Sequence, residues 1–430
     1  MRHLRAWKGA VQLFFLAFAL QVHSVRNNAV NSSRFSQRMK NLVPIGLRSF
    51  GVSLLLSFLV TRTVAQQSFQ LKYQDWDEDR DRISVRSWYA QAEATLGTDW
   101  SIGVTGMVDT VSGATPMGRP PTENRRDWLV EIEEERRAGI VSLAGKKNDY
   151  DFSFEIGLSD EPDYLSRSYA FNVSRGFAED TLSVFGGFSY MDDEVDSGVP
   201  GGPGLGVVRK QTPEVMLGVS RILDPKTFLT FNLTYGRPDG YLSDPYKQIG
   251  LTEVLFPGDP VREKEVFYLY PENRPDERET FVAYLEGVRY LEKLNASVET
   301  SYRYFKDDSG LEGHTMEIQW FQRVGEKFVV RPLFRHYLQR ASDFYRISLD
   351  GSGITPSLQP DGSSPFYSAD YRLSKLRTST YGLKVTYFHR EDLTIDVAWD
   401  RYLMSGRDGA TSQLVYPDAN VLTMGLQYEF

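Results

Sequence analysis

Apolar and polar residues alternate along most of this chain. The last ten residues show the pattern most clearly, with Leu422, Met424, Leu426, Tyr428 and Phe430 on one face and Thr423, Gly425, Gln427 and Glu429 on the other. Because successive side chains of a β-strand point to opposite faces, this period of two predicts strands with one apolar and one polar face. The same pattern recurs upstream, at 101–109, 152–159, 168–174, 229–235 and 393–400.

Short and long connections separate these predicted strands. Every second connection is brief, at 97–99, 146–149, 178–180, 224–226, 292–295, 325–327 and 389–392. The intervening ones include long segments at 111–135, 192–212, 237–277, 342–375 and 406–420. Membrane barrels join strands by short periplasmic turns and longer outer loops. We therefore predict an all-β fold, a transmembrane antiparallel β-barrel of about 16 strands, and 14 or 18 strands also fit the pattern.

The first 65 residues have a different character from the rest of the chain. They contain nine Lys or Arg and no acidic residue, with an apolar core at 52–60 and small residues leading to Ala65. This order is typical of a secretory signal. We expect a leader at 1–65, in which the signal peptide is 39–65 and is cleaved after Ala65, followed by a barrel domain at 66–430. The alternative is that an earlier apolar run forms a membrane anchor.

Without the leader, 40 basic residues face 57 acidic ones, a formal charge of −17. Such a body repels phosphate, so we expect no nucleic-acid partner. The absence of cysteine excludes disulfides, thiolate zinc sites and thiol nucleophiles. Aromatic residues make up 13% of the sequence. A soluble β-sandwich or propeller would bury them in its core, whereas a membrane barrel places them in girdles, here predicted from Trp88, Trp100, Tyr164, Tyr190, Tyr235, Tyr302, Tyr387 and Tyr402.

Seven segments carry a resemblance to a known family. They are 109–116 (DTVSGATP), 163–166 (DYLS), 240–247 (GYLSDPYK), 271–275 (PENRP), 302–308 (YRYFKDD), 335–341 (RHYLQRA) and 367–374 (YSADYRLS). In this order they resemble a bacterial family of uncharacterised outer-membrane β-barrels, catalogued as a domain of unknown function. The resemblance implies the barrel fold and the outer membrane, and it brings no ligand or reaction. The terminal Phe430, with Tyr428, also resembles the signal by which barrel assembly machinery recognises such proteins, so that machinery and outer-membrane lipid are the expected partners.

Charged residues on the polar face of the strands between 296 and 337 are the main site candidates. Alternation points six of them inward, namely Glu299, Arg303, Glu317, Arg323, Arg331 and Arg335, and Asp109 joins them from an earlier strand. Charges avoid hydrocarbon but can pair or meet water in a lumen, and about 16 strands enclose a channel unless something fills it. Two interpretations stay open, a ladder of Arg and Glu pairs that braces the wall or a charged constriction that selects solutes.

A motif just beyond the strand ending at Asp109 is the second candidate. Ser112, Gly113, Thr115 and Pro116 suit a fixed turn, and the following loop is long enough to fold into the lumen. We expect this segment to form a constriction or plug loop.

Candidate chemistry is sparse in the predicted barrel. A hydrolase at the rim would need a His beside a Ser or a carboxylate, and His314, close to Asp307 and Asp308, is the best placed. The acidic run 75–81 fails as a calcium loop because Arg80 stands where glycine is required. We expect no enzymatic activity, metal or cofactor. The predicted function is a porin-like channel for small solutes in the bacterial outer membrane, with a rim hydrolase and a non-conducting scaffold or secretion partner as alternatives.

Overall fold

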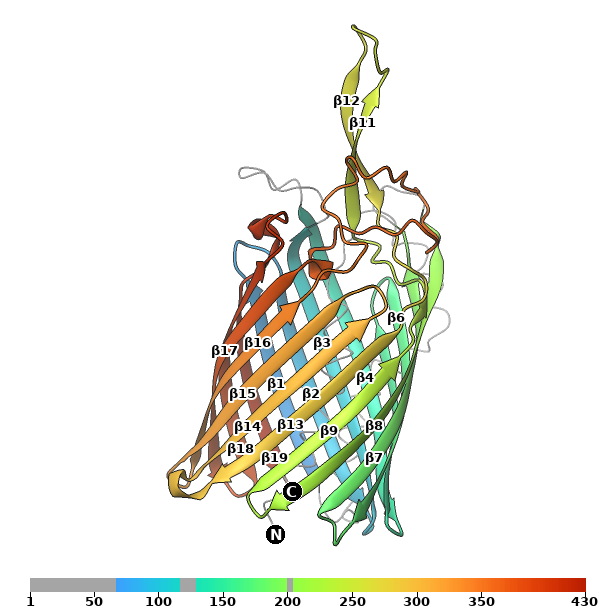
Figure 1. The fold of residues 1–430 in the computed structure, drawn as a ribbon. Helices are drawn as coiled ribbons and strands as arrows, with labels where there is room; N and C mark the ends of the chain where they lie inside the picture. The colour runs from blue at the N-terminus through green and yellow to red at the C-terminus, as the bar shows by residue number, and fades with distance from the viewer. Residues whose placement is uncertain (1–66, 117–128, 199–203) are drawn as a thin grey trace, which may run out of the picture.

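The protein is a closed β-barrel whose wall runs antiparallel throughout (Figure 1). The computed structural model describes residues 67–116, 129–198 and 204–430, so the predicted signal peptide and its cleavage after Ala65 lie outside the described residues. The sheet contains 17 strands, but the two-residue β10 (Asp239–Gly240) only adds to the end of β8, which leaves 16 strands in the wall. The predicted fold class and strand number are therefore confirmed.

The wall strands have the following bounds: β1 (Gln67–Glu78), β2 (Ser84–Leu96), β3 (Trp100–Pro116), β4 (Leu129–Lys147), β5 (Tyr150–Asp160), β6 (Tyr164–Phe177), β7 (Leu182–Asp196), β8 (Val207–Asp224), β9 (Thr227–Gly236), β13 (Thr280–Leu291), β14 (Ala296–Asp307), β15 (Glu312–Val324), β16 (Phe328–Gln339), β17 (Leu376–Arg390), β18 (Leu393–Gly406) and β19 (Ala419–Glu429). Each pairs with its neighbour in this order. Among the described residues no helix has the length and apolar character of a membrane span. The described part of the chain has three short 3-10 helices, η2 (Glu292–Leu294), η3 (Tyr371–Leu373) and η4 (Gln413–Val415), all in connections.

The barrel closes where its first strand meets its last. β1 pairs with β19 from Ser68 opposite Glu429 to Glu78 opposite Ala419. The backbone N–H of Phe430 donates to the Gln67 carbonyl at 2.9 Å and extends this ladder by one bond. Closure removes the free edges on which an open sheet would recruit other strands.

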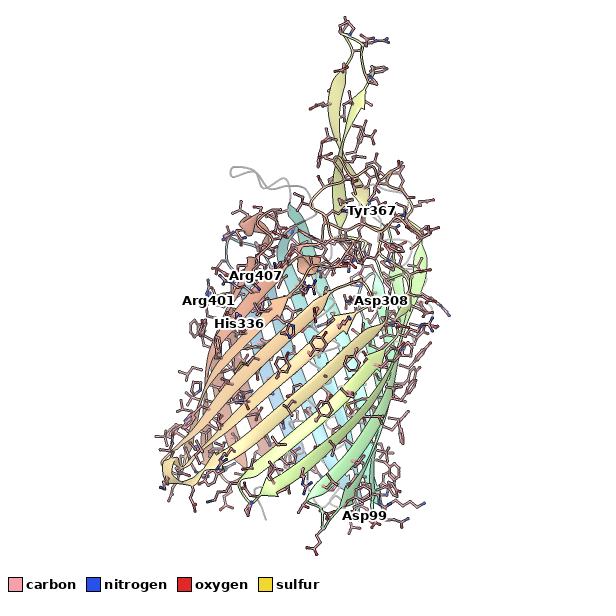
Figure 2. The ribbon with its side chains drawn as sticks, viewed as in Figure 1. Asp99, Asp308, His336, Tyr367, Arg401 and Arg407 are labelled. Carbon is pink, nitrogen blue, oxygen red and sulfur yellow. The ribbon has the colours of Figure 1, made fainter. Side chains whose placement is uncertain are left out.

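The two ends of the barrel differ, as the spacing of connections predicts. The first residue of β1, the C-terminal Phe430 and the short turns lie at one end, called the turn end here (Figure 1). Asp99 lies at the turn end, whereas Asp308 and Tyr367 lie toward the opposite, loop end (Figure 2). The hairpin of β11 (Gln248–Leu255) and β12 (Lys264–Pro271) projects beyond the loop end. All connections at the turn end are tight, and at Gly97 a φ of 68° requires the conformational freedom of glycine.

The outward face of the wall is apolar. In β9, Phe231, Leu233 and Tyr235 point outward and are 38–45% exposed, whereas the intervening Thr230 and Asn232 point into the barrel. The same alternation holds in β19, whose Met424 and Leu426 are exposed. An apolar exterior around a polar interior is the arrangement that a barrel needs in hydrocarbon.

Two of the aromatic predictions are wrong. Tyr164 and Tyr402 were expected in the outer girdle, but the register points both into the barrel. Tyr164 is buried and its hydroxyl donates to Asp193, and the Tyr402 ring packs on Trp76 at 5.2 Å between centroids. Trp88 and Trp100 are exposed on the outside, in line with the prediction.

Four strands near the loop end are longer than the alternation predicts. β3 continues to Pro116 and β4 begins at Leu129, so both enter the segment 111–135 that was expected to be a connection. Similarly, β7 and β8 extend into 192–212. Outside the apolar belt both faces of a strand meet polar surroundings, so alternation disappears although the backbone ladder continues. The alternation of apolar and polar residues therefore shows which part of a strand crosses the apolar belt, but it does not show where the strand ends.

Candidate functional site

The inner face of the wall contains the predicted lumen charges. The register from β14 to β16 places Ser301 opposite Glu317 and Glu317 opposite Arg335, so these side chains share the inner face. Glu299 and Arg303 lie two residues from Ser301 on β14 and share its orientation. Alternation alone thus assigns the facing of these residues correctly.

The charges on this wall do not form a continuous ladder of pairs. The Nε of Arg335 lies 4.0 Å from Oε2 of Glu317, at the outer limit of an ion pair. In the part of the chain that the structure describes, Glu299 has no ion pair, and the guanidinium of Arg331 lies 5.8 Å from the centre of the Phe321 ring. Arg303 packs in the same way over Phe305, at 5.3 Å. Bracing by Arg and Glu pairs is therefore incomplete, and charges of both signs remain available to the lumen.

Arg323 does not belong with these charges. Its side chain is exposed next to the turn between β15 and β16, where its Nη2 lies 3.4 Å from the Glu326 carbonyl oxygen. The alternation predicts that Arg323 faces inward, but it does not predict its position along the barrel axis. Arg323 lies at the rim of the turn end, near the end of β15.

Asp109 points inward but is already engaged. It is 2% exposed, and its Oδ2 accepts from the Nε of Arg136 on β4 at 2.9 Å. The Nη1 of Arg136 also lies 4.0 Å from Oε1 of Glu161. This buried group ties β3 to β4 and to the next outer connection, rather than presenting a free charge to a solute.

The segment from Ser112 to Pro116 is strand and not the start of a loop. It pairs with β4 throughout, with Ser112 opposite Glu133 and Pro116 opposite Leu129. Gly113 has a φ of 120°, and a Cβ there would lie 1.9 Å from the Arg82 carbonyl oxygen. The glycine thus allows the β1–β2 connection to lie against β3. The rest of the expected plug loop, 117–128, lies outside the described residues.

Several further charges on neighbouring strands also face the lumen and were not among the predicted site residues. Lys72 on β1 and Lys384 on β17 point inward, with Asp396 and Asp400 on β18. The Nζ of Lys384 lies 2.7 Å from Oδ1 of Asp396. The same alternation rule, applied to these strands, would have placed all four residues.

A second group of charges lies over the loop end. It consists of three acidic and three basic residues, called the cap cluster here: Asp244, Lys247, Glu272, Arg274, Asp370 and Arg372. The first four come from the connection between β9 and β13, and the last two from the connection between β16 and β17. Lys247, Glu272 and Asp370 are at most 3% exposed. Equal numbers of each sign allow these charges to be buried together.

Within the cap cluster, Asp370 is held by two guanidinium groups. The Nε of Arg372 donates to both of its carboxylate oxygens, at 2.9 and 2.8 Å, and Nη2 of Arg274 donates to Oδ2 at 2.9 Å. Arg372 also donates to Asp244 at 2.6 Å, and the Nε of Arg274 lies 2.6 Å from Oε1 of Glu272. Each arginine therefore joins two carboxylates, so the cluster acts as one unit.

The cap cluster connects loops that start on distant parts of the wall. Lys247 extends to β3, where its Nζ donates to the Pro116 carbonyl at 2.9 Å. Its ammonium also lies 5.7 Å from the centre of the Tyr371 ring, and Arg82 lies 5.8 Å from the same ring. Arg82 in turn donates to the Val415 carbonyl at 2.6 Å. Four outer connections and β3 are thereby linked across the loop end, and we call this assembly the cap.

Burial dominates the electrostatics of the cap cluster. It raises the pKa of Glu272 to about 7, with Asp244 and Asp370 acting in the same direction and Arg274 and Ser368 in the opposite one. Burial would also raise the pKa of Asp370, but Arg372, Lys247 and Arg274 together hold it below its usual value. Burial and Arg372 lower the pKa of Lys247. Glu272 is thus the member of the cluster whose charge changes near neutral pH.

The cap cluster is not predictable as a site from the pattern of the sequence. Its residues lie in irregular connections, where no periodicity assigns a face or a partner. One signal was present, because all six fall within three of the segments that carry the family resemblance, 240–247, 271–275 and 367–374. A fourth such segment, 109–116, supplies the oxygens that Lys247 contacts. Segments far apart in the chain thus meet in one place.

The three histidines of the barrel lie apart from both charge groups. His314 is on the outer face, where its Nδ1 lies 2.7 Å from the Tyr302 hydroxyl and its ring packs near Tyr304. His336 also faces outward and bonds Ser379, and His389 is at the turn end.

Comparisons with known proteins give one family match and several solved structures. The family model "Protein of unknown function (DUF3570)" matches residues 55–135 and 205–430. No curated protein matches the sequence. Among solved structures, a mutant of the ferric enterobactin receptor PfeA from Pseudomonas aeruginosa is 10% identical with a TM-score of 0.40, covering 81% of this chain and 54% of its own.

Two further solved structures are also matched. CdiB from Acinetobacter baumannii is 10% identical with a TM-score of 0.46, over 85% of this chain and 60% of its own. The outer-membrane-expressed OmpT of Vibrio cholerae is 10% identical with a TM-score of 0.41, over 86% of this chain and 99% of its own. The chain thus spans little more than half the length of the receptor and three fifths of CdiB.

Proposed function

This chain belongs to the DUF3570 family of proteins of unknown function, and we propose that it is a bacterial outer-membrane channel through which small hydrophilic solutes pass. The observation that carries the proposal is the wall itself, 16 strands with an apolar outside and a charged, polar inside. Barrels of this size have room for an aqueous channel. Apart from the terminal Phe430, the described residues outside the strands belong to connections between strands.

In this proposal the turn end faces the periplasm and the cap covers the outer mouth. Short periplasmic turns and long outer loops are the usual arrangement of such barrels. Because the cap links connections from distant parts of the wall, its opening and closing would control access to the lumen. The signal peptide at 39–65 belongs to the same proposal, since a barrel reaches the outer membrane only after export.

Planar-bilayer recording tests the channel proposal directly. The refolded protein, residues 66–430, is expected to give stepwise single-channel currents with weak ion selectivity, because the lumen wall carries both signs of charge. A folded barrel that inserts but passes no current would contradict the proposal and favour the scaffold role instead.

The proposal assigns no reaction to the barrel. A rim hydrolase would need a base beside a nucleophile, whereas the hydrogen-bond partner of His314 is the Tyr302 hydroxyl on the lipid-facing side. A His314→Ala variant is expected to keep the same channel currents as the native protein. Hydrolysis of envelope lipid or polymer by the native protein that is lost in this variant would contradict the assignment.

Phe430 gives a prediction about assembly. The ring stacks edge-on against Tyr428 at 4.6 Å between centroids, and both face outward at the turn end, accessible to assembly machinery. Deleting Phe430 is expected to lower the amount of barrel in the outer membrane several-fold, while the same protein still refolds in detergent. The measurement is the heat-modifiable gel shift of membrane fractions. Equal amounts of folded native and shortened protein would contradict the prediction.

A further inference from the structure

Charges of opposite sign lie side by side on one part of the lumen wall without pairing completely. On β13–β15, Glu286 and Glu317 both lie opposite Ser301, and Glu299 is two residues from Ser301. On β16 and β17, Arg331 lies opposite Lys384. We call these five residues, together with Lys72 on β1, the lumen stripe. Its acidic part and its basic part are separate but adjacent.

The lumen stripe retains unpaired charge of each sign. Glu299 is near enough to Glu286, Glu317 and Arg331 for their charges to interact, yet it forms no ion pair within the described residues. Arg331 contacts an aromatic ring, and its Nε is buried without a hydrogen-bond acceptor. Lys72 interacts electrostatically with Lys384, Asp396 and Arg331, and like charges prevail around it. An unpaired charge in the barrel wall carries a smaller desolvation free energy when water or a solute can reach it.

Two glycines leave room for this arrangement. Gly382 lies opposite Asp400, and a Cβ at Gly382 would lie 2.0 Å from its carboxylate oxygen. Gly425 lies opposite Asp396, and a Cβ there would lie 2.6 Å from its carboxylate. Both aspartates therefore fold flat against the wall, where Asp396 pairs with Lys384. Within the lumen stripe, Glu299 and Arg331 thus remain as an acid and a base that form no ion pair among the described residues.

The wall on another side of the lumen has a different character. The inward residues of β4–β6 are mostly small and uncharged, as in Ala138, Ser142, Ser153, Ser168, Ala170 and Asn172. Glu155 is the main exception. The charge is therefore concentrated on the side of the lumen that carries the lumen stripe. A small solute can approach the lumen stripe without meeting a similar set of charges on the wall across the lumen.

We propose that the lumen stripe binds small zwitterionic solutes, molecules with one ammonium and one carboxylate group, as they pass through the lumen. Glu299 would receive the ammonium and Arg331 the carboxylate, since a guanidinium pairs well with planar carboxylates. Arg331 lies two strands from Glu299 and is offset from it by two residues along the strands, so their backbones are about 12 Å apart, a gap that the two side chains and a small solute can fill. A simple anion or cation satisfies only one of the two sites. This inference rests on the proposed channel function and adds a solute class to it.

Liposome swelling tests the inference with two solutes of similar size, zwitterionic γ-aminobutyrate and neutral threitol. In phosphatidylcholine vesicles with the native barrel, γ-aminobutyrate is expected to permeate roughly three- to tenfold faster than threitol, the range that weak solvent-exposed ion pairs support. Replacing both Glu299→Gln and Arg331→Gln is expected to lower the γ-aminobutyrate rate to that of threitol and leave the threitol rate unchanged. A heat-modifiable gel shift verifies that each variant is folded.

Glu155→Gln is the matched control, because it removes a lumen carboxylate from the side away from the lumen stripe. This variant is expected to retain the preference for γ-aminobutyrate. Equal rates for the two solutes through the native barrel, or a preference that survives the double substitution, would overturn the zwitterion site and leave the channel intact. If neither solute permeates faster than in protein-free vesicles, the channel function itself is wrong.

Discussion

Replacing Asp370 with asparagine is expected to release the cap and to increase single-channel conductance. Asp370 is buried, and its carboxylate accepts hydrogen bonds from Arg372 and Arg274. Removing its charge leaves the two guanidinium groups with an excess of positive charge in a buried site. Breaking a buried ion pair in this way costs about 3–5 kcal/mol, which is a large part of what a few outer connections can contribute.

The effect of Asp370→Asn should stay within the cap. The wall is held by backbone ladders that involve none of the cap cluster, and the closing ladder between β1 and β19 is remote from it in the chain. Planar-bilayer recording is therefore expected to show larger or more frequent openings, and limited proteolysis is expected to cut the 340–375 connection faster. The heat-modifiable gel shift of the barrel should match that of the native protein.

Asp361→Asn is the matched control for this experiment. Asp361 lies in the same connection and is exposed, and its partner is the neighbouring Ser363, at 2.6 Å between the Ser hydroxyl and Oδ1. Its substitution removes the same charge without disturbing a buried pair, so conductance and proteolysis are expected to stay native. If Asp370→Asn behaves like this control, the cap cluster does not hold the loops over the mouth.

The fold could be predicted because the barrel imposes a rule on each strand separately. Leu422 to Phe430 and Phe231 to Tyr235 obey the period of two, since every second side chain must meet an apolar exterior. Where that requirement ends, the prediction ends too, as in the strand residues 112–116 that were expected to form a loop. The facing of Tyr402 was mispredicted for a related reason, because an aromatic residue near a strand end can face either the inside or the outside of the wall.

The candidate site was only partly predictable, for two physical reasons. Alternation fixes which face Glu299, Arg331 and Arg335 occupy, but pairing depends on how far each side chain extends across its neighbours. The cap cluster depends instead on contacts between residues more than 90 positions apart, such as Arg274 with Asp370. No local pattern encodes such a contact, although the family resemblance marked the segments that make it.

The cap is expected to open less often at pH 5 than at pH 8, because Glu272 gains a proton in the closed state. Its pKa rises from a usual value of 4.5 to about 7 when the cap is closed, under the influence of burial and of the nearby Asp244 and Asp370. Between these two values the closed cap binds a proton that the open cap does not. Closure is thus favoured as the pH falls through 7, by up to about 3 kcal/mol.

The other titratable groups of the cap cluster either change charge outside pH 5–8 or favour closure of the cap at higher pH instead of lower pH. The pKa of Asp244 and of Asp370 lies below the usual 3.8, so the stability that they contribute is lost only in stronger acid. The lowered pKa of Lys247 favours closure as the pH rises toward its usual 10.5, which is the opposite direction. Glu272 faces Arg274 and accepts hydrogen bonds from Ser368 and the Asp244 backbone, and Arg274 and Ser368 act against the rise in its pKa.

Opening frequency in planar bilayers at pH 5, 6, 7 and 8 measures this dependence, and Glu272→Gln isolates its source. Glutamine resembles the protonated acid, so the variant is expected to open rarely at every pH in this range and to lose most of the pH dependence. Lumen groups such as Glu299 are unchanged in the variant, and any effect of their own titration on conductance remains in both proteins. A native channel with the same opening frequency at pH 5 and pH 8, or a Glu272→Gln channel that keeps the native dependence, would show that Glu272 does not control the cap.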